Sequence, residues 1–435
     1  MDSFSLFDAD GMHAWAVATA AVVAAGCALV GTLLVVRRMS LVGDCVSHAV
    51  LPGVAIAVLA GGRPGGPLVL CGAAVAALVS VWLARLVHTS AGIAADAAAG
   101  VSFTTLFAAG VLLVTASASR VDLDPGCVLH GVLEMVPFDT VPVGGLEVPR
   151  AFVTGVAVLV ALLAGLLATW NLQVAVAFDS GAAEAAGLPV RGTTTSLLVA
   201  TALVTVAGFE AVGAILVVAM LVVPAATAEL LSRRLHSIAA LAVVFGITAA
   251  VVGYLAAWRW NTNAAGMIAV VLGIQYAAAV VLAPDGGLLS RAANRVRFRG
   301  RVLLEDRLAA WWRAREMSPS SDRPAHQSAD ASAYQRAADR LADLCLWCTG
   351  RLGRDGGRLS LTPRGRREAD TVVRSHRLWE AWLGKHADLP LDHLHPPAEW
   401  IEHHIGADLR RRIEVEVGAE TNDPHGRAIP PEPHA

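Results

Sequence analysis

Long apolar segments separated by short polar connections occupy the first two thirds of the chain. They predict helices that cross a membrane, because a helix needs about 20 apolar residues to span the hydrocarbon core. The runs lie at about 13–36, 45–60, 67–87, 98–117, 151–169, 193–209, 211–231, 237–257 and 264–283. The runs at 45–60 and 193–209 are short, so either could be a re-entrant or half-buried helix. The pattern predicts a polytopic all-α membrane protein with about eight or nine transmembrane helices.

The pattern changes after residue 290. Shorter amphipathic helices are predicted at about 302–316 and 331–346, followed by a hairpin with Asp355-Gly356-Gly357 at its turn. Thr362-Pro363 then begins another helix. These elements predict a C-terminal α+β domain of winged-helix-like type.

Charge divides the chain at the same place. Residues 1–290 carry 25 charged side chains, near 9%, whereas residues 291–435 carry 45, near 31%. We therefore expect a transmembrane domain over 1–285, a basic linker and helix over 286–330, and a water-soluble domain over 331–435. The overall net charge of −2 gives no bulk attraction to nucleic acid.

Arginines in the connections predict the orientation. If the chain crosses nine times and its N-terminus is outside, six arginines of the connections lie on the cytoplasmic side and four lie outside. This excess agrees with the positive-inside rule, by which cytoplasmic loops carry more Lys and Arg. The same orientation places the arginine-rich C-terminal part in the cytoplasm. The basic stretch from Arg291 to Arg301 is then expected at the inner leaflet, where anionic lipid attracts arginine.

Lysine and cysteine usage limit the chemistry. Lys385 is the only lysine, and it lacks the glycines and Ser/Thr of a phosphate-binding loop, so we expect that this chain binds no ATP. Cys345-x-x-Cys348 could hold a metal or act in redox chemistry, but no second pair follows it. We interpret the two cysteines as packed thiols.

Two ionisable residues interrupt the second apolar run. Asp44 and His48 are four residues apart, so on a helix they share one face. Together they could ligate a divalent cation, or they could form a hydrogen-bonded pair that fixes helix packing. Burying either group alone in lipid is costly. Pro52-Gly53 then interrupts the helix, as in discontinuous helices that handle ions.

The segment 39–53 resembles the hallmark of the permease subunits of manganese, zinc and iron ABC importers. The resemblance extends over about residues 10–285 and includes Phe178-Asp179, Gly187-Leu188-Pro189 and Glu210-Ala211-Val212-Gly213. It implies a bacterial plasma-membrane permease that pairs with a second, identical or related, permease. A separate ABC ATPase and a metal-specific solute-binding protein are the implied partners.

The same resemblance implies site residues. Asp44 and His48 are expected in the metal path, and Glu210 either lines that path or lies at a hairpin tip. A short helix of small residues over 179–188 is expected to contact the ATPase, or else to be an ordinary capped helix within a loop. Its candidate coupling residues are Asp179, Glu184 and Gly187.

The soluble part carries a second candidate metal site. Glu399, Glu402 and His403 have the spacing of one helical face, and carboxylates with imidazole suit Mn²⁺ or Fe²⁺. Residues 358–430 resemble the diphtheria-toxin-repressor and manganese-regulator family. The resemblance implies two metal sites. The regulatory site consists of His376, Glu399, Glu402, His403 and Asp306. The ancillary site consists of His376, Glu380 and His395.

The resemblance favours Mn²⁺ over Fe²⁺ or Zn²⁺, because Glu399 stands where iron-type members have cysteine. Ala309 occupies the position of another acidic ligand. The segment 317–324 replaces the first helix of a helix-turn-helix, so we expect metal sensing without operator binding.

Two other functions remain open at this point. One is a proton-coupled metal transporter that uses Asp44 and His48 as a relay. The other is a membrane-tethered transcription regulator, whose DNA contacts would need Arg351, Arg354 and Arg358 of the hairpin. The leading hypothesis is a metal importer permease whose cytoplasmic domain restrains transport when metal is replete.

Overall fold

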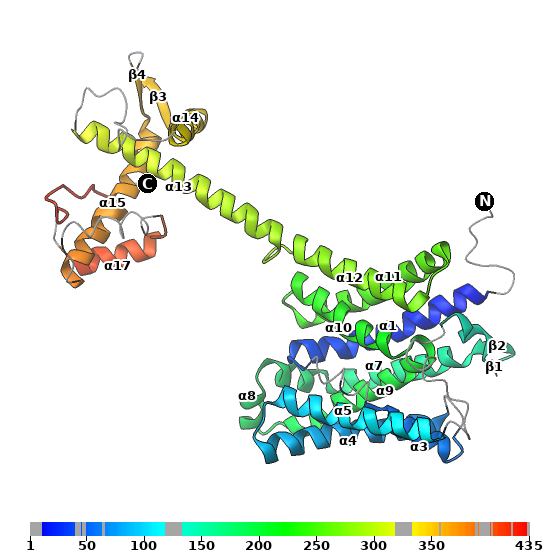
Figure 1. Ribbon diagram of the computed structural model, residues 1–435. Coiled ribbons are helices and arrows are strands. Elements are labelled where there is room, and N and C mark those ends of the chain that lie inside the picture. The colour runs from blue at the N-terminus through cyan, green and yellow to red at the C-terminus, as the bar shows by residue number, and fades with distance from the viewer. Residues whose placement is uncertain are drawn as a thin grey trace. The chain divides into compact units, whose positions relative to one another are not determined.

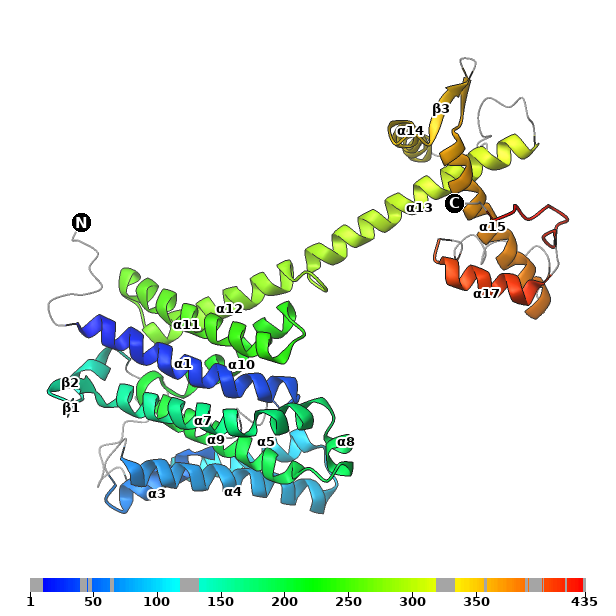
Figure 2. The same cartoon turned by 180° about the vertical axis from the view of Figure 1, so that it is seen from behind.

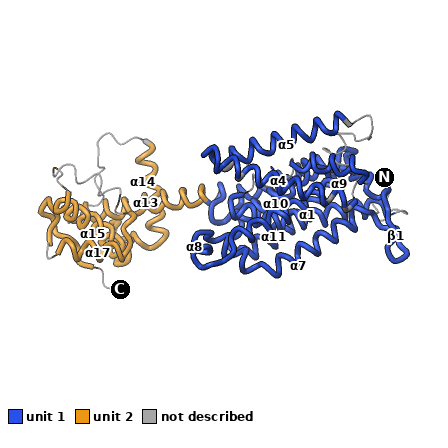
Figure 3. The backbone as a smooth tube through the Cα atoms, turned by 90° about the horizontal axis from the view of Figure 1, so that it is seen from below, with its two compact units in different colours: residues 1–290 blue, residues 291–435 orange. Residues whose placement is uncertain are grey.

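The computed structural model describes residues 11–432, apart from 40–44, 46–48, 63–65, 118–132, 318–332, 356–357, 388–389, 391–400, 402 and 419–420. The chain separates into two compact units, residues 1–290 and 291–435 (Figure 3).

Unit 1 is a bundle of apolar helices (Figure 1). Its helices are α1 (Met12–Val36), α3 (Leu51–Leu59), α4 (Pro67–Ala91), α5 (Ala95–Ser117), α7 (Arg150–Phe178), α8 (Ser180–Ala185), α9 (Val190–Val212), α10 (Ala214–Leu231), α11 (Leu235–Trp260) and α12 (Ala264–Leu282). Within the described part of the chain, eight helices are long and apolar enough to cross a membrane. The expected polytopic α-helical fold is confirmed.

The two short apolar runs differ in outcome. The run at 193–209 belongs to α9, a helix of 23 residues that is long and apolar enough to cross a membrane. The run at 45–60 contains α3, a helix of only nine residues with Pro52 in its first turn. A helix of this length is shorter than the hydrocarbon core.

A small β-hairpin precedes α7 and was not predicted. It follows the 3₁₀ helix η1 (Leu133–Phe138), and its strands are β1 (Thr140–Val143) and β2 (Leu146–Pro149). The strands pair antiparallel with Val143 opposite Leu146. Gly144 and Gly145 form the two-residue turn with φ values of 58° and 89°, a conformation that glycine adopts without steric cost.

Helix α1 lies in the centre of unit 1 and packs against α7, α9, α10 and α11 (Figures 1 and 2). Its contact with α10 depends on Gly31, because a Cβ atom there would lie 1.7 Å from the carbonyl oxygen of Leu221. Small residues at such a crossing allow helix backbones to approach closely in a membrane.

Side-chain contacts define the two ends of the bundle. At one end, His13 Nδ1 of α1 lies 3.0 Å from Tyr254 Oη of α11. At the other end, Arg37 at the end of α1 donates to the side-chain oxygen of Gln173 in α7. Arg233 and Asp285 form an ion pair of 3.5 Å between the α10–α11 connection and the segment after α12. The C-terminal ends of α1, α7 and α12, and with them α8, therefore lie at one end, where the chain leaves unit 1.

Unit 2 consists of four helices and a two-stranded hairpin in the residues described. They are α13 (Leu288–Met317, which begins at the boundary), α14 (Ala333–Cys348), β3 (Leu352–Asp355), β4 (Arg358–Leu361), α15 (Pro363–His386) and α17 (Ala407–Val417). The hairpin and the start of α15 lie where the sequence predicts them, and Thr362 Oγ1 accepts a hydrogen bond from Gly365 N. The basic stretch expected as a linker is instead part of α13, a single helix of 30 residues.

Two apolar clusters form the core of unit 2. Leu308 and Trp311 of α13 pack with Leu346 of α14, near the hairpin and the start of α15. A second cluster joins the end of α15 to α17 through Leu378 and Ile413. Helix α15 therefore links both clusters.

Candidate metal-binding sites

His403 lies between two carboxylates of α13. Its Nδ1 is 2.7 Å from Glu305 Oε2, and its Nε2 is 3.0 Å from Asp306 Oδ1. The imidazole is buried, with 4% of its side chain exposed, whereas the side chain of Asp306 is 52% exposed. A buried imidazole thus meets two acidic groups that are partly open to solvent.

Both contacts of His403 are of hydrogen-bond length. Ionised carboxylates only accept hydrogen bonds, and a neutral imidazole has a single N–H to donate. Both contacts of His403 can therefore be hydrogen bonds when the three groups together carry one additional proton, and a divalent cation bound by the same groups would take the place of that proton. The arrangement is suited to a hard divalent cation, which prefers oxygen ligands together with imidazole.

A second pair of candidate ligands lies on α15. His376 Nε2 is 3.1 Å from Glu380 Oε1, one helical turn away. Both residues are buried, with 3% and 2% exposure. An ionisable pair this deeply buried is retained against a large desolvation cost and is a candidate for function.

Sequence reasoning missed Glu305. The resemblance to the repressor family led to Asp306 and Ala309, but Ala309 is 1% exposed and packs against Val372 and Val373. A carboxylate at that position would be buried in an apolar cluster. Glu305 supplies the second acidic group instead. The sequence did contain a signal for Glu305. Glu305 and Asp306 are adjacent acidic residues, and every charged residue before them in this helix is an arginine.

One other charge of α13, that of Arg307, is paired with α14. Arg307 donates to both carboxylate oxygens of Asp343, at 2.8 and 2.7 Å, and Trp311 donates to the same carboxylate. Burial lowers the pKa of Arg307, but its hydrogen bonds and the charges of Asp343 and Asp339 raise that pKa above the usual value. This ion pair fixes α14 on α13 and leaves Glu305 and Asp306 on the side that meets His403.

Arg377 joins three segments of the same domain. It forms two hydrogen bonds with Glu316 at the end of α13 and donates to the carbonyl oxygen of Ala428. Its guanidinium also lies 3.7 Å from Asp423 Oδ2 and 5.0 Å from the ring centre of Trp312. The side chain is 3% exposed, so the C-terminal segment is held by a buried ionic network.

The remaining predicted ligands are only partly covered by the structure. Glu399, Glu402 and His395 in unit 2, and Asp44 and His48 in unit 1, lie outside the described residues. Glu210 lies in the last turn of α9, three residues before Gly213 at the turn to α10. Among the residues described, no group of three or more His, Cys, Asp and Glu side chains has the arrangement of a complete metal site.

The predicted coupling segment is an exposed capped helix. Asp179 precedes α8 and accepts hydrogen bonds from Gly181 N and Ala182 N, at 2.9 and 3.0 Å. Gly187 ends the segment with φ of 77°, where a Cβ atom would contact nothing. Glu184 is exposed, as is Phe178 at 94%. The segment is thus locally rigid and accessible.

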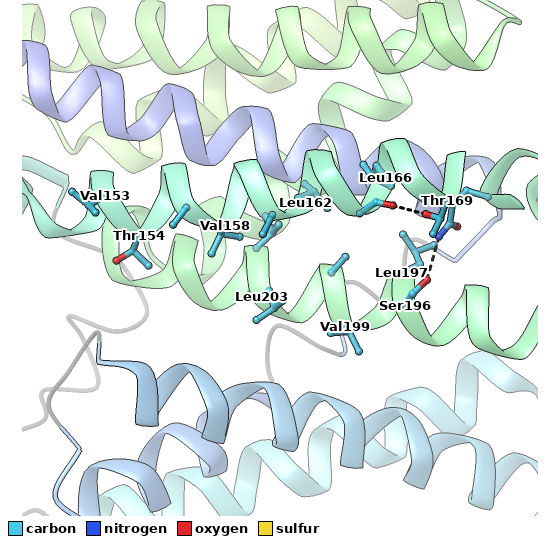
Figure 4. Close-up of a pocket in the computed structure, with 16 residues that line it drawn as sticks. Val153, Thr154, Val158, Leu162, Leu166, Thr169, Ser196, Leu197, Val199 and Leu203 are labelled. Atoms are coloured by element: carbon cyan, nitrogen blue, oxygen red, sulfur yellow. Dashed lines mark hydrogen bonds between the residues drawn. The ribbon is translucent and has the colours of Figure 1, made fainter. Parts of the chain in front are cut away.

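A cleft of about 700 Å³ lies between α7 and α9 in unit 1 (Figure 4). Aliphatic side chains line most of its length, and Thr169 and Ser196 lie near one end. The amide of Gln173, another lining residue, donates a hydrogen bond to Ser196. None of its lining residues is charged. The cleft therefore lacks the ligands that a divalent cation requires.

Residues 10–283, which comprise this helical bundle, match the model of the ABC 3 transport family. The chain belongs to the ABC 3 transport family. It is a membrane-spanning permease subunit of an ABC transporter and not the ATPase subunit.

Relatives in this family match the same part of the chain. The manganese transport system membrane protein MntD of Bacillus subtilis (strain 168) is 38% identical over 280 residues, which are 64% of this chain and 95% of that protein. The zinc transport system membrane protein TroD of Treponema pallidum (strain Nichols) is 32% identical over 62% of this chain and 74% of its own length. The solved structure of PsaBC from Streptococcus pneumoniae in complex with Fab is similar, with a TM-score of 0.56 and 29% identity over 63% of this chain and 92% of that chain.

A different family matches the end of this ABC 3 permease. Residues 362–431 match the iron dependent repressor, metal binding and dimerisation domain. That range contains α15, α17, His376 and His403. Both expected resemblances are confirmed, and they occupy separate parts of one chain.

Proposed function

We propose that this permease imports a divalent transition metal, with Mn²⁺ favoured and Fe²⁺ or Zn²⁺ as the alternatives. The similarity of residues 10–283 to manganese and zinc transport membrane proteins carries this proposal. The partners are an ABC ATPase, a metal-specific solute-binding protein and a second permease subunit in a bacterial plasma membrane.

Asp44, His48 and Glu210 are the proposed path residues. Support comes from the chain on either side of His48. Cys45, Ala49 and Val50 are buried, and Val50 packs against α4 and α9. The segment that carries Asp44 and His48 is thus flanked by residues inside the bundle, where ionisable groups are rare and generally functional.

Helix α8 is the proposed contact for the ATPase. It lies at the end of the bundle that the arginine distribution assigns to the cytoplasm, and the chain continues into unit 2 from that end. Its exposure and its cap at Asp179 support this role, because a rigid surface is needed to transmit movement. Glu184 and Gly187 are the residues through which we expect coupling.

The C-terminal domain is proposed to bind the same class of metal in the cytoplasm and to restrain transport when metal is abundant. The position of His403 between Glu305 and Asp306 supports metal binding. His376, Glu399 and Glu402 complete the proposed regulatory site, and Glu380 and His395 belong to the ancillary site. A metal that links the α13 carboxylates to His403 would stiffen the helix through which the chain leaves the membrane unit.

Metal-resolved uptake tests the transport function. The permease, its ATPase and its binding protein are placed in proteoliposomes, and entry of Mn²⁺, Fe²⁺ and Zn²⁺ is measured with and without ATP. ATP-dependent uptake of Mn²⁺ supports the proposal. Uptake driven by a proton gradient without the ATPase would instead show a secondary transporter.

Transport at increasing internal metal tests the regulatory function. Wild-type uptake should fall as internal Mn²⁺ rises, and the double variant Glu402→Ala/His403→Ala should continue to transport. Coincident curves, together with no metal binding by calorimetry, would overturn the sensor. A gel-shift assay with the full chain in detergent tests the remaining alternative, a DNA-binding regulator.

A further inference from the structure

Helix α14 has two apolar faces, and the described residues of unit 2 cover only one of them. Ala342 and Leu346 are buried, and Leu346 packs with Leu308 and Trp311. The other face consists of exposed residues. We call it the α14 seam: Tyr334, Ala337, Leu341, Leu344 and Cys348.

The α14 seam has the spacing of a coiled coil. Its members follow one another at intervals of three, four, three and four residues, the a/d pattern of a heptad repeat. Tyr334, Leu341 and Leu344 are 83%, 62% and 55% exposed. The four charged residues of α14 lie off this line, and two of them, Asp339 and Asp343, bind Arg307.

From this pattern we propose that α14 pairs with α14 of a second copy of this chain. A strict a/d stripe is narrower than the apolar face of a helix that lies on lipid or covers a core, and it fits a single partner helix. The segment 318–332, which precedes α14 in the sequence, is rich in Ser, Ala, Pro and Asp and offers no matching apolar repeat.

The available area fits a pair of anchored copies. An aromatic side chain buries about 150–250 Å² when it is covered, so Tyr334, the adjacent Trp347 and two leucines supply on the order of 500 Å² per copy. Two copies together reach about 1,000 Å², the lower bound for a specific interface. Two permease subunits in one transporter would raise the effective concentration of one α14 near the other. In this respect the inference rests on the proposed function.

The seam also accounts for the exposure of Cys348. Cys345 and Cys348 are exposed, so the interpretation as packed thiols is wrong. Cys348 occupies an a position, where two parallel helices place equivalent residues face to face. Residues 284–361 lie between the two family matches, so this surface is separate from the matched dimerisation domain.

Disulfide crosslinking in the full-length transporter tests the pairing. All cysteines except Cys348 are replaced, the transporter is reconstituted at a high lipid-to-protein ratio, and copper phenanthroline is added. We expect a disulfide-linked dimer in a major fraction of the chains. The double variant Leu341→Asp/Leu344→Asp should reduce this fraction at least tenfold, and it should not disturb the fold, because both side chains are exposed in the single copy.

Val296 provides the matched controls, because it is a 70% exposed aliphatic residue of α13 away from the seam. Val296→Asp should leave the Cys348 crosslink unchanged, and a cysteine placed only at Val296 should crosslink weakly. A spin label on Cys348 supplies an independent readout. A distance below about 20 Å between the two spin labels supports pairing. A spin label that has no second label nearby and is accessible to oxygen dissolved in lipid would overturn the pairing proposal and indicate that α14 contacts the membrane. A transporter that imports metal but shows neither the Cys348 disulfide nor a dipolar interaction between two spin labels would reject the α14 pair. The proposed function would then remain intact.

Discussion

His403 Nδ1 lies 2.7 Å from Glu305 Oε2, although 98 residues separate the two in the sequence. Glu305 belongs to α13, a helix that begins at Leu288 where the membrane unit ends. The same helix therefore leaves the membrane unit and presents carboxylates to the metal-binding domain. A ligand bound at His403 would act directly on this helix, which gives the proposed regulation a short physical route.

Removing the α13 carboxylates should weaken metal binding. We expect Glu305→Gln/Asp306→Asn to reduce the affinity of the full-length protein for Mn²⁺ by about 10- to 100-fold, the usual effect of losing groups that position or supplement metal ligands. Calorimetry in detergent measures this change. Asp408→Asn, at an exposed carboxylate paired with Arg411, is the control and should bind Mn²⁺ normally. Unchanged affinity in the double variant would show that Glu305 and Asp306 are not part of the site.

Loss of either path residue should stop transport. We expect Asp44→Ala and His48→Ala each to abolish metal uptake while ATPase binding persists, because no other group would replace a ligand inside the apolar bundle. Uptake and co-purification of the ATPase are measured on the same samples. Asp139→Asn, at a half-exposed carboxylate near β1, should transport normally. Near-normal uptake by both path variants would contradict the assignment.

Changes in α8 should separate ATP hydrolysis from transport. Gly187 has φ of 77°, so Gly187→Val strains the end of α8 although a Cβ atom would meet no neighbour. We expect this variant and Glu184→Arg to lower metal uptake per ATP hydrolysed at least tenfold. Glu184→Gln, which keeps the shape of the side chain, is the control. Crosslinks that place α8 on the outer side of the membrane would overturn both this prediction and the orientation.

The Arg377 network should be the main polar contribution to the stability of unit 2. Arg377→Met leaves the buried carboxylate of Asp423 and the carboxylate of Glu316 without their cation, and we expect a loss of about 3–5 kcal/mol. Hydrogen exchange of the backbone amides of residues 362–431 in the full chain measures the loss. Arg411→Met, which removes an exposed ion pair, should change the same quantity by less than about 1 kcal/mol.

The sequence alone predicted the membrane spans, because a helix in lipid must satisfy its backbone hydrogen bonds locally and cover the bilayer with its own length. The apolar run predicted at 193–209 was shorter than α9, which begins at Val190 and ends at Val212. Its first three residues are the polar Thr193, Thr194 and Thr195. In the structure, each hydroxyl donates to the carbonyl oxygen four residues earlier, at 2.9, 3.0 and 2.9 Å. A threonine that bonds its own helix in this way does not end a span.

Only the tertiary structure decided which distant groups meet. Periodicity indicated a common helical face for residues near His403, but it contained no information about the partner of that face, and Glu305 was overlooked. Nor could the sequence show which apolar face of α14 is covered, because Leu346 and Leu341 are equally apolar and only packing against Leu308 and Trp311 distinguishes them. Hydrophobic periodicity is a local property of the chain, whereas ion pairing and burial depend on contacts between residues far apart in the sequence.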